Sequence, residues 1–193
     1  EDVATVLAGV TVADVDLDSG PLGRGVVEIT ITATNGGVAV DNVAGLYLTQ
    51  SFAFASTLSS NPHTPLVFRA SLEVANAALA TLTYTSMRDY VGPDAVVVSV
   101  SDLGWSAGSG IGDVGTDELS IPVDVAAVND PPVVSVPPVV ATSTDEDETL
   151  PIYRAHGIQI TDVDIENELM YVTVSASYGR LGLGSTDNIE FTA

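Results

Sequence analysis

The sequence predicts an all-β protein in which β-sandwich units follow one another in tandem, with the second unit incomplete. Three observations predict it. Short apolar segments alternate with polar residues and are separated by Gly, Pro and Asn, as in Asn35-Gly36-Gly37. Much of the apolar content is Val and Ala, and aromatic residues make up only 6% of the chain, a composition that suits sheet faces better than a helical core. Part of the sequence is also repeated.

Period-two alternation is clearest in residues 26–34, where Val27, Ile29 and Ile31 fall on one face. Further strands are expected at 6–12, 45–50, 65–70, 80–86, 94–101 and 117–125. Strands at this spacing are typical of a β-sandwich. Residues 72–82 are the exception, because alanine and leucine recur there at helical spacing, and we expect a short helix.

Comparison of the chain with itself reveals two copies of one unit. Three segments recur in the same order: 26–40 with 169–183, Asp14-Val15-Asp16 with Asp162-Val163-Asp164, and Glu1-Asp2 with Glu146-Asp147. We therefore expect one nearly complete unit of about 130 residues, the first third of another, and a parent protein that continues beyond it.

A proline-rich stretch lies between the two copies. Residues 128–138 read Val-Asn-Asp-Pro-Pro-Val-Val-Ser-Val-Pro-Pro. Because proline lacks a backbone N–H and biases its neighbours to extended conformations, this stretch should be a short, stiff connector. We therefore divide the chain into a repeat at 1–128, a linker at 129–144 and the N-terminal part of a second repeat at 145–193.

The charge of the chain narrows the range of partners. Asp and Glu number 26 against 5 arginines and no lysine, a formal net charge of −21. Such a chain repels nucleic acid and anionic membrane surfaces but attracts metal cations. The absence of cysteine removes disulfides, zinc–thiolate sites and thiol catalysis. No apolar run approaches the roughly 20 residues of a membrane span, so we expect no membrane insertion.

Two Asp-x-Asp pairs have the chemistry of calcium ligands. Calcium takes about six to eight oxygen ligands, chiefly carboxylates and carbonyls. Asp14 with Asp16, and Asp162 with Asp164, each follow one apolar segment and precede another, so both pairs should lie in loops at the end of a sandwich. Each of these acids could instead be only a turn residue, since aspartate favours turns through local hydrogen bonds.

Other familiar motifs are incomplete. The first Asp-x-Asp pair begins an EF-hand spacing, but Ser19 stands where that loop needs glycine and Gly25 where it needs glutamate. Residues 110–115 fit Gly-x-Gly-x-x-Gly, yet a strand-like segment follows where phosphate binding needs a helix. His63 and His156 lack the Ser or Asp constellation of nucleophilic catalysis.

Several segments together resemble cadherin-like repeats, in particular the divergent, bacterial-type repeats of giant surface and adhesion proteins. The segments are Val128-Asn129-Asp130-Pro131-Pro132, Ile160-Thr161-Asp162-Val163-Asp164, Val98-Ser99-Val100-Ser101-Asp102-Leu103-Gly104, and the stretches from Ala77 to Tyr84 and from Asp89 to Asp94. The resemblance implies immunoglobulin-like, Greek-key β-sandwich repeats in tandem, with Ca2+ bound at the junctions between them.

The resemblance also implies which residues share each ion. The internal junction would use Glu1, Asn129, Asp130, Asp162 and Asp164, with Asp130 central. The preceding junction would use Asp14, Asp16 and Asp102, and the following one Glu146 and Asp147. The acidic Asp-Arg-Glu signature of true cadherins is replaced by Thr83-Tyr84-Thr85, so we expect fewer ions at each junction.

These features predict a non-catalytic, calcium-binding structural or adhesive module of a long extracellular or cell-surface protein. The expected partners are neighbouring repeats of the same chain, with homophilic contact or filament self-assembly besides. One alternative is a subunit of an extracellular filament, such as a mastigoneme-like flagellar hair or a surface fibre. Another is an accessory domain of a secreted carbohydrate-active enzyme, although Trp105 is the only tryptophan that could form a sugar platform.

Overall fold

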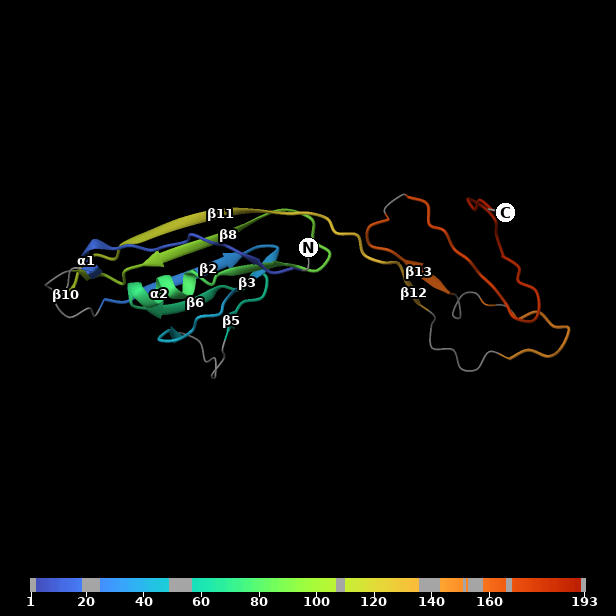
Figure 1. The fold of residues 1–193 in the computed structure, drawn as a ribbon, viewed down its shortest axis with the longest axis horizontal. Coiled ribbons are helices and arrows are strands. Elements are labelled where there is room, and N and C mark those ends of the chain that lie inside the picture. Colours follow the sequence, from blue (N-terminus) through green and yellow to red (C-terminus); the bar gives the residue numbers. More distant parts are fainter. Residues whose placement is uncertain are drawn as a thin grey trace. The chain divides into compact units, whose positions relative to one another are not determined.

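The computed structural model describes residues 3–18, 25–48, 57–106, 110–135, 143–150, 152, 158–165 and 168–191. The chain divides into two units, Glu1–Val128 and Asn129–Ala193 (Figure 1). Strand residues make up 34% and helical residues 7%. The paired strands that the structure describes are antiparallel. The all-β prediction is therefore confirmed.

The first unit is a sandwich of two sheets, with strand orders β1-β7-β3-β5 and β11-β8-β2-β6-β4. The smaller sheet contains β1 (Thr5–Val6), β7 (Thr83–Ser86), β3 (Gly36–Val40) and β5 (Leu58–Ser59). The larger contains β11 (Thr116–Val125), β8 (Gly92–Ser101), β2 (Val27–Ala33), β6 (Leu66–Ala70) and β4 (Tyr47–Leu48). A separate hairpin joins β9 (Trp105–Ser106) to β10 (Gly110–Ile111), and Gly-x-Gly-x-x-Gly leads from it into β11.

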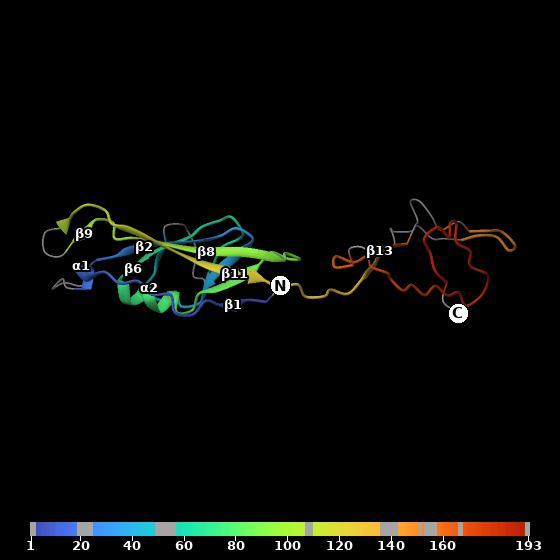
Figure 2. The same cartoon turned by 90° about the horizontal axis from the view of Figure 1, so that it is seen from above.

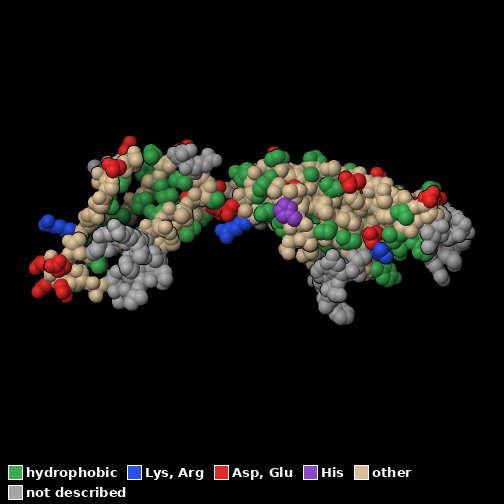
Figure 3. All heavy atoms as spheres, turned by 180° about the vertical axis from the view of Figure 1, so that it is seen from behind, with side chains coloured by type: hydrophobic (Ala, Val, Ile, Leu, Met, Phe, Trp, Pro, Cys, Tyr) green, Lys and Arg blue, Asp and Glu red, His purple; other side chains and the backbone are tan. Residues whose placement is uncertain are grey.

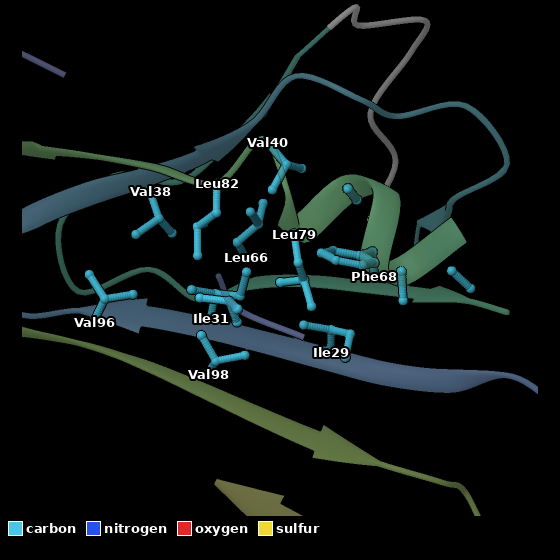
Figure 4. Close-up of a cluster of buried hydrophobic side chains, with 14 of the residues drawn as sticks. Ile29, Ile31, Val38, Val40, Leu66, Phe68, Leu79, Leu82, Val96 and Val98 are labelled. Carbon is cyan, nitrogen blue, oxygen red and sulfur yellow. The ribbon is translucent and has the colours of Figure 1, made fainter. Parts of the chain in front are cut away.

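The predicted alternation of residues 26–34 is confirmed in β2. Val27, Ile29 and Ile31 are at most 1% exposed and face the space between the sheets, where Figure 4 shows the two isoleucines among the core side chains. The chain then crosses to the other sheet at Asn35, so β2 and β3 lie in different layers. This crossing lets one short segment line both sides of the core.

The helix predicted at 72–82 is α2 (Leu72–Leu79). The hydroxyl of Ser71 caps it by accepting the N–H of Val74 at 3.4 Å. Its buried face contains two alanines, which let the helix backbone approach β6 and β2 closely. Leu79 packs in the core with Phe68 (Figure 4). No helix in the described part of the chain is long and apolar enough to cross a membrane.

The strand predicted at 6–12 is wrong beyond Val6, and the side chain of Asn76 in α2 gives the reason. Its Oδ1 accepts the N–H of Val12 at 2.7 Å, and its Nδ2 donates to the carbonyl of Val12 at 2.8 Å. The backbone of this segment is therefore paired with a helix side chain instead of a neighbouring strand. The same contact anchors the chain just before Asp14.

The carboxylate of Asp94 stabilises the turn at which the chain crosses from one sheet to the other. Asp94 in β8 accepts N–H groups from Asn35 at 2.9 Å, Ala95 at 2.8 Å and Thr34 at 3.3 Å, and the Tyr84 hydroxyl of β7 donates to it at 2.8 Å. Burial alone raises the pKa of Asp94, but these hydrogen bonds outweigh burial and lower it. Burial and the neighbouring Asp94 raise the pKa of Tyr84. Asp94 thus joins the two sheets as an ionised acceptor.

The second unit has little regular structure among its described residues. β12 (Val133–Ser135) pairs with β13 (Gln159–Thr161). β12 lies within the stretch predicted as a linker, where these three residues stand between proline pairs and keep their N–H donors. Residues 169–183, the second copy of the β2–β3 segment, form no strand.

Replacing Asp94 by asparagine should lower the free energy of unfolding by about 1.5–3 kcal/mol, because a charged acceptor of several hydrogen bonds is lost. Urea denaturation followed by circular dichroism measures the loss. Asp113→Asn, which changes an exposed acid without a described side-chain hydrogen bond, is the control and should alter stability by less than about 0.5 kcal/mol.

Equal losses in the two variants would contradict this role for Asp94. The pH dependence is a second check. Because folding lowers the pKa of Asp94 from 3.8, its stabilisation is complete above pH 3.8 and is lost as pH falls through the folded-state value. The stability difference between wild type and Asp94→Asn should therefore shrink below pH 3.8.

Candidate metal centre

The pairing of β12 with β13 brings predicted acids of the second unit together. Val133 is paired with Thr161 in an antiparallel register. Continuing this register back from Val133 sets Asp130 opposite Asp164. The N–H of Asp130 donates to Oδ2 of Asp164 at 2.5 Å. Residues far apart in sequence therefore meet at the end of a two-stranded ribbon.

Local hydrogen bonds shape both sides of this meeting point. Oδ1 of Asp162 accepts the N–H of Asp164 at 3.0 Å, which forms an Asx turn directly after β13. On the other side, Nδ2 of Asn129 donates to the carbonyl of Asp130 at 3.0 Å. The predicted ligands Asn129, Asp130, Asp162 and Asp164 thus lie in one region, which we call the Asp130 centre.

The Asp130 carboxylate has an oxygen that the protein leaves unpaired. Its Oδ2 is buried and has no hydrogen-bond partner in the part of the chain that the structure describes. A buried carboxylate oxygen without a donor is costly, and a cation that prefers oxygen ligands would satisfy it. Among the described residues, no three acid or imidazole side chains already form a metal-ready group. Metal binding would therefore require the acidic side chains of this region to rearrange.

The first unit repeats the Asp-x-Asp turn at the start of α1 (Val15–Asp18). Oδ1 of Asp14 accepts the N–H of Asp16 at 2.8 Å and that of Leu17 at 3.2 Å, so Asp14 caps a helical turn. The first of these bonds matches the bond between Asp162 and Asp164. The two sequence copies thus share one local geometry, in which the first aspartate holds the backbone of the second.

Asp102 lies at the same end of the first unit, because α1 contacts β9, which follows Asp102 in the chain (Figures 1 and 2). Its Oδ1 accepts the N–H of Gly104 at 2.7 Å and that of Gly115 at 2.8 Å. Leu103 and Gly104 both have positive φ, 55° and 77°, a conformation that explains the glycine of Asp-x-Gly. Asp102 therefore shapes the turn that leads from β8 into the β9–β10 hairpin.

Three predicted ligands remain: Glu1, Glu146 and Asp147. Glu1 lies outside the described residues. Glu146 and Asp147 occupy an exposed turn that is closed by a hydrogen bond from the N–H of Glu148 to the carbonyl of Asp145 at 3.3 Å. Within the described parts of the chain, no hydrogen bond links this turn to the Asp130 centre, and its acids form no metal-ready group with the acids there.

The first unit also has a hollow of about 310 Å³ where β1, β7 and β11 meet. Valines form much of its wall, Asp124 is its single carboxylate, and Oγ of Ser86 is buried beside it without a partner. Trp105, the tryptophan considered above as a sugar platform, lies outside this hollow and is 37% exposed. The hollow therefore lacks the pair of carboxylates that glycoside hydrolysis uses.

Asp94 is the important acid that sequence reasoning missed. Its position after Pro93, near the start of a long valine-rich strand, was the available signal, because proline within a sheet is found at strand beginnings and edges. The donors that surround Asp94 come from three separate segments, and their approach depends on the fold.

Comparison of the chain with protein-family models, curated proteins and solved structures finds no match. The resemblance to cadherin-like repeats therefore stays a prediction from the residues quoted above. A functional proposal for this chain therefore rests on the arrangement of its acidic residues.

Replacing Asp14 by alanine should lower the free energy of unfolding by about 0.5–2 kcal/mol in the presence of a chelator, because α1 loses its cap. Asp16→Ala should change it by less than about 0.5 kcal/mol, because the exposed Asp16 carboxylate accepts no hydrogen bond from a described residue. Thermal unfolding measures both changes. Equal losses of stability in the two variants would contradict the assignment of Asp14 as the helix cap and of Asp16 as an acid without a structural role.

Proposed function

We propose that the chain is a non-catalytic structural or adhesive module of a long extracellular or cell-surface protein, and that Ca2+ binds at its Asp130 centre. The observation that carries the proposal is the approach of Asp164 to Asp130, whose own Oδ2 is buried and unpaired. Calcium prefers several carboxylate and carbonyl oxygens, and this region offers both.

The charge balance supports a metal ion as the missing partner. The arginine ion pairs of the described residues, Arg69 with Glu28 and Arg88 with Asp89, lie in the first unit. None of them reaches the Asp130 centre. Carboxylates gathered without a cation repel one another, most strongly where they are shielded from water. A divalent ion would reverse the sign of that interaction.

A mechanical role follows from the position of Asp130 in the chain. It comes directly after Asn129, where the second unit begins. In the absence of metal, repulsion between carboxylates favours opening of this segment. With Ca2+ shared between Asp130 and the Asp162–Asp164 turn, the segment would be held against β13, and the connection between the units would stiffen.

Calcium should bind wild-type protein with a dissociation constant on the order of 10⁻⁴–10⁻³ M, the range of extracellular calcium modules. Asp130→Asn should weaken binding by at least about tenfold, because it removes charge from the central ligand. Isothermal titration calorimetry measures both affinities. Glu190→Gln removes the same charge from an exposed acid of the same unit and should leave the affinity unchanged.

Two outcomes would contradict the calcium proposal: no saturable heat with wild type, or equal affinities in the two variants. Stability without metal gives a further check. In a chelator, Asp130→Asn should be neutral or stabilising, because it relieves a buried, uncompensated charge.

A further inference from the structure

The peptide bond between Asp130 and Pro131 combines residues that no other bond of the chain combines. Of the ten prolines, only Pro131 follows an aspartate. The carboxylate of an aspartate can attack its own main-chain carbonyl carbon and close a five-membered ring. Where the next residue has a backbone N–H, that nitrogen competes by attacking the side chain instead. Proline has no backbone N–H, so the competing reaction cannot occur at this bond.

The side chain of Asp130 is available as this nucleophile. Its Oδ2 is buried and accepts no hydrogen bond from a described residue. Asp94, Asp102 and Asp14 differ, because their carboxylates accept backbone N–H groups. Other acids lie at the surface of both units, where water solvates them (Figure 3). Donors and water lower the reactivity of a carboxylate, so a buried oxygen without a donor is the more reactive one.

The main-chain carbonyl that this oxygen would attack already accepts a hydrogen bond. Nδ2 of Asn129 donates to the carbonyl oxygen of Asp130 at 3.0 Å. When a nucleophile adds to a carbonyl carbon, negative charge develops on the carbonyl oxygen, and a donor that is already in place stabilises this charge. The backbone of Asp130 is also held, because its N–H donates to Oδ2 of Asp164 at 2.5 Å. The nucleophile, the carbonyl and its donor therefore belong to two consecutive residues, one of which is anchored.

We propose that the bond between Asp130 and Pro131 is a site of self-cleavage in the calcium-free chain. Oδ2 of Asp130 bonds to its own carbonyl carbon, and the bond from that carbon to the nitrogen of Pro131 breaks. The nitrogen takes a proton from water, and the hydroxide left behind opens the cyclic anhydride, so that one water is consumed. The products are residues 1–130 and residues 131–193. Cleavage separates the sandwich of the first unit from β12 and β13.

The test follows the full chain in a chelator, at constant pH and temperature, by intact-mass spectrometry. Two fragments should accumulate whose masses add up to that of the chain plus one water, and the smaller should begin at Pro131. Asp130→Ala should abolish cleavage, and Asn129→Ala should slow it at least about tenfold because the carbonyl loses its donor. Glu190→Gln, which changes an exposed acid of the same unit, should cleave like the wild type.

The same chain unfolded in guanidinium chloride separates the effect of the fold from the ordinary reactivity of an Asp-Pro bond. The unfolded chain keeps the bond but loses the fixed Asn129 donor and the buried position of Oδ2. Its cleavage should therefore be at least about tenfold slower than that of the folded chain. Absence of fragments from the folded chain, equal rates in the folded and unfolded chains, or equal rates in wild type and Asn129→Ala would each overturn the proposal.

A further arm of the experiment rests on the proposed calcium centre. A calcium ion at Oδ2 would bind the nucleophilic oxygen, so replacing the chelator by calcium should slow cleavage at least about tenfold. Fragments that form at one rate with and without calcium would support self-cleavage and contradict the calcium centre. A chain that stays intact in the chelator overturns self-cleavage, and the calcium titration then decides the calcium centre independently.

Discussion

The interaction on which this chain depends is an aspartate carboxylate that accepts backbone N–H groups at a turn. Asp94 fastens the crossing between the sheets in this way, Asp102 shapes the turn after β8, and Asp14 and Asp162 shape the two Asp-x-Asp turns. With so few cations in the chain, backbone dipoles take the place of arginine and lysine as partners of these acids. Asp130 differs, because its buried Oδ2 has no hydrogen-bond donor among the described residues. The proposed calcium ion would satisfy this carboxylate oxygen.

The sequence predicted correctly those elements that are determined by the spacing of their own apolar residues. The alternation in β2 and the alanine-rich spacing of α2 are two examples, because burial of one face decides each of them. The sequence reading failed where a distant side chain decides the backbone. Asn76 pairs with Val12 and replaces the expected strand. Gly36, read as a turn residue, is the first residue of β3, and the position needs glycine because a Cβ there would lie 2.3 Å from the ring of Tyr84.

The acids of the Asp130 centre were predicted as a set by resemblance, but their meeting could not be derived from local sequence. It depends on the register of β12 with β13, and β12 falls in a stretch that its prolines marked as a connector. The sequence identifies residues that could bind a metal, whereas the hydrogen bonds that these residues already accept are known only from the structure. For Asp14 and Asp102 those donors are backbone N–H groups. The carboxylates predicted to bind metal therefore also stabilise turns.

The central claim is that calcium at the Asp130 centre fixes the connection between the two units. The most direct measurement is the distance distribution between spin labels on cysteines introduced at Ala77 and Ser177, which are exposed and lie one in each unit of a chain without native cysteine. Calcium should narrow the distribution obtained in a chelator, and Asp130→Asn should abolish the narrowing. Equal widths with and without calcium in the wild-type chain would contradict the claim.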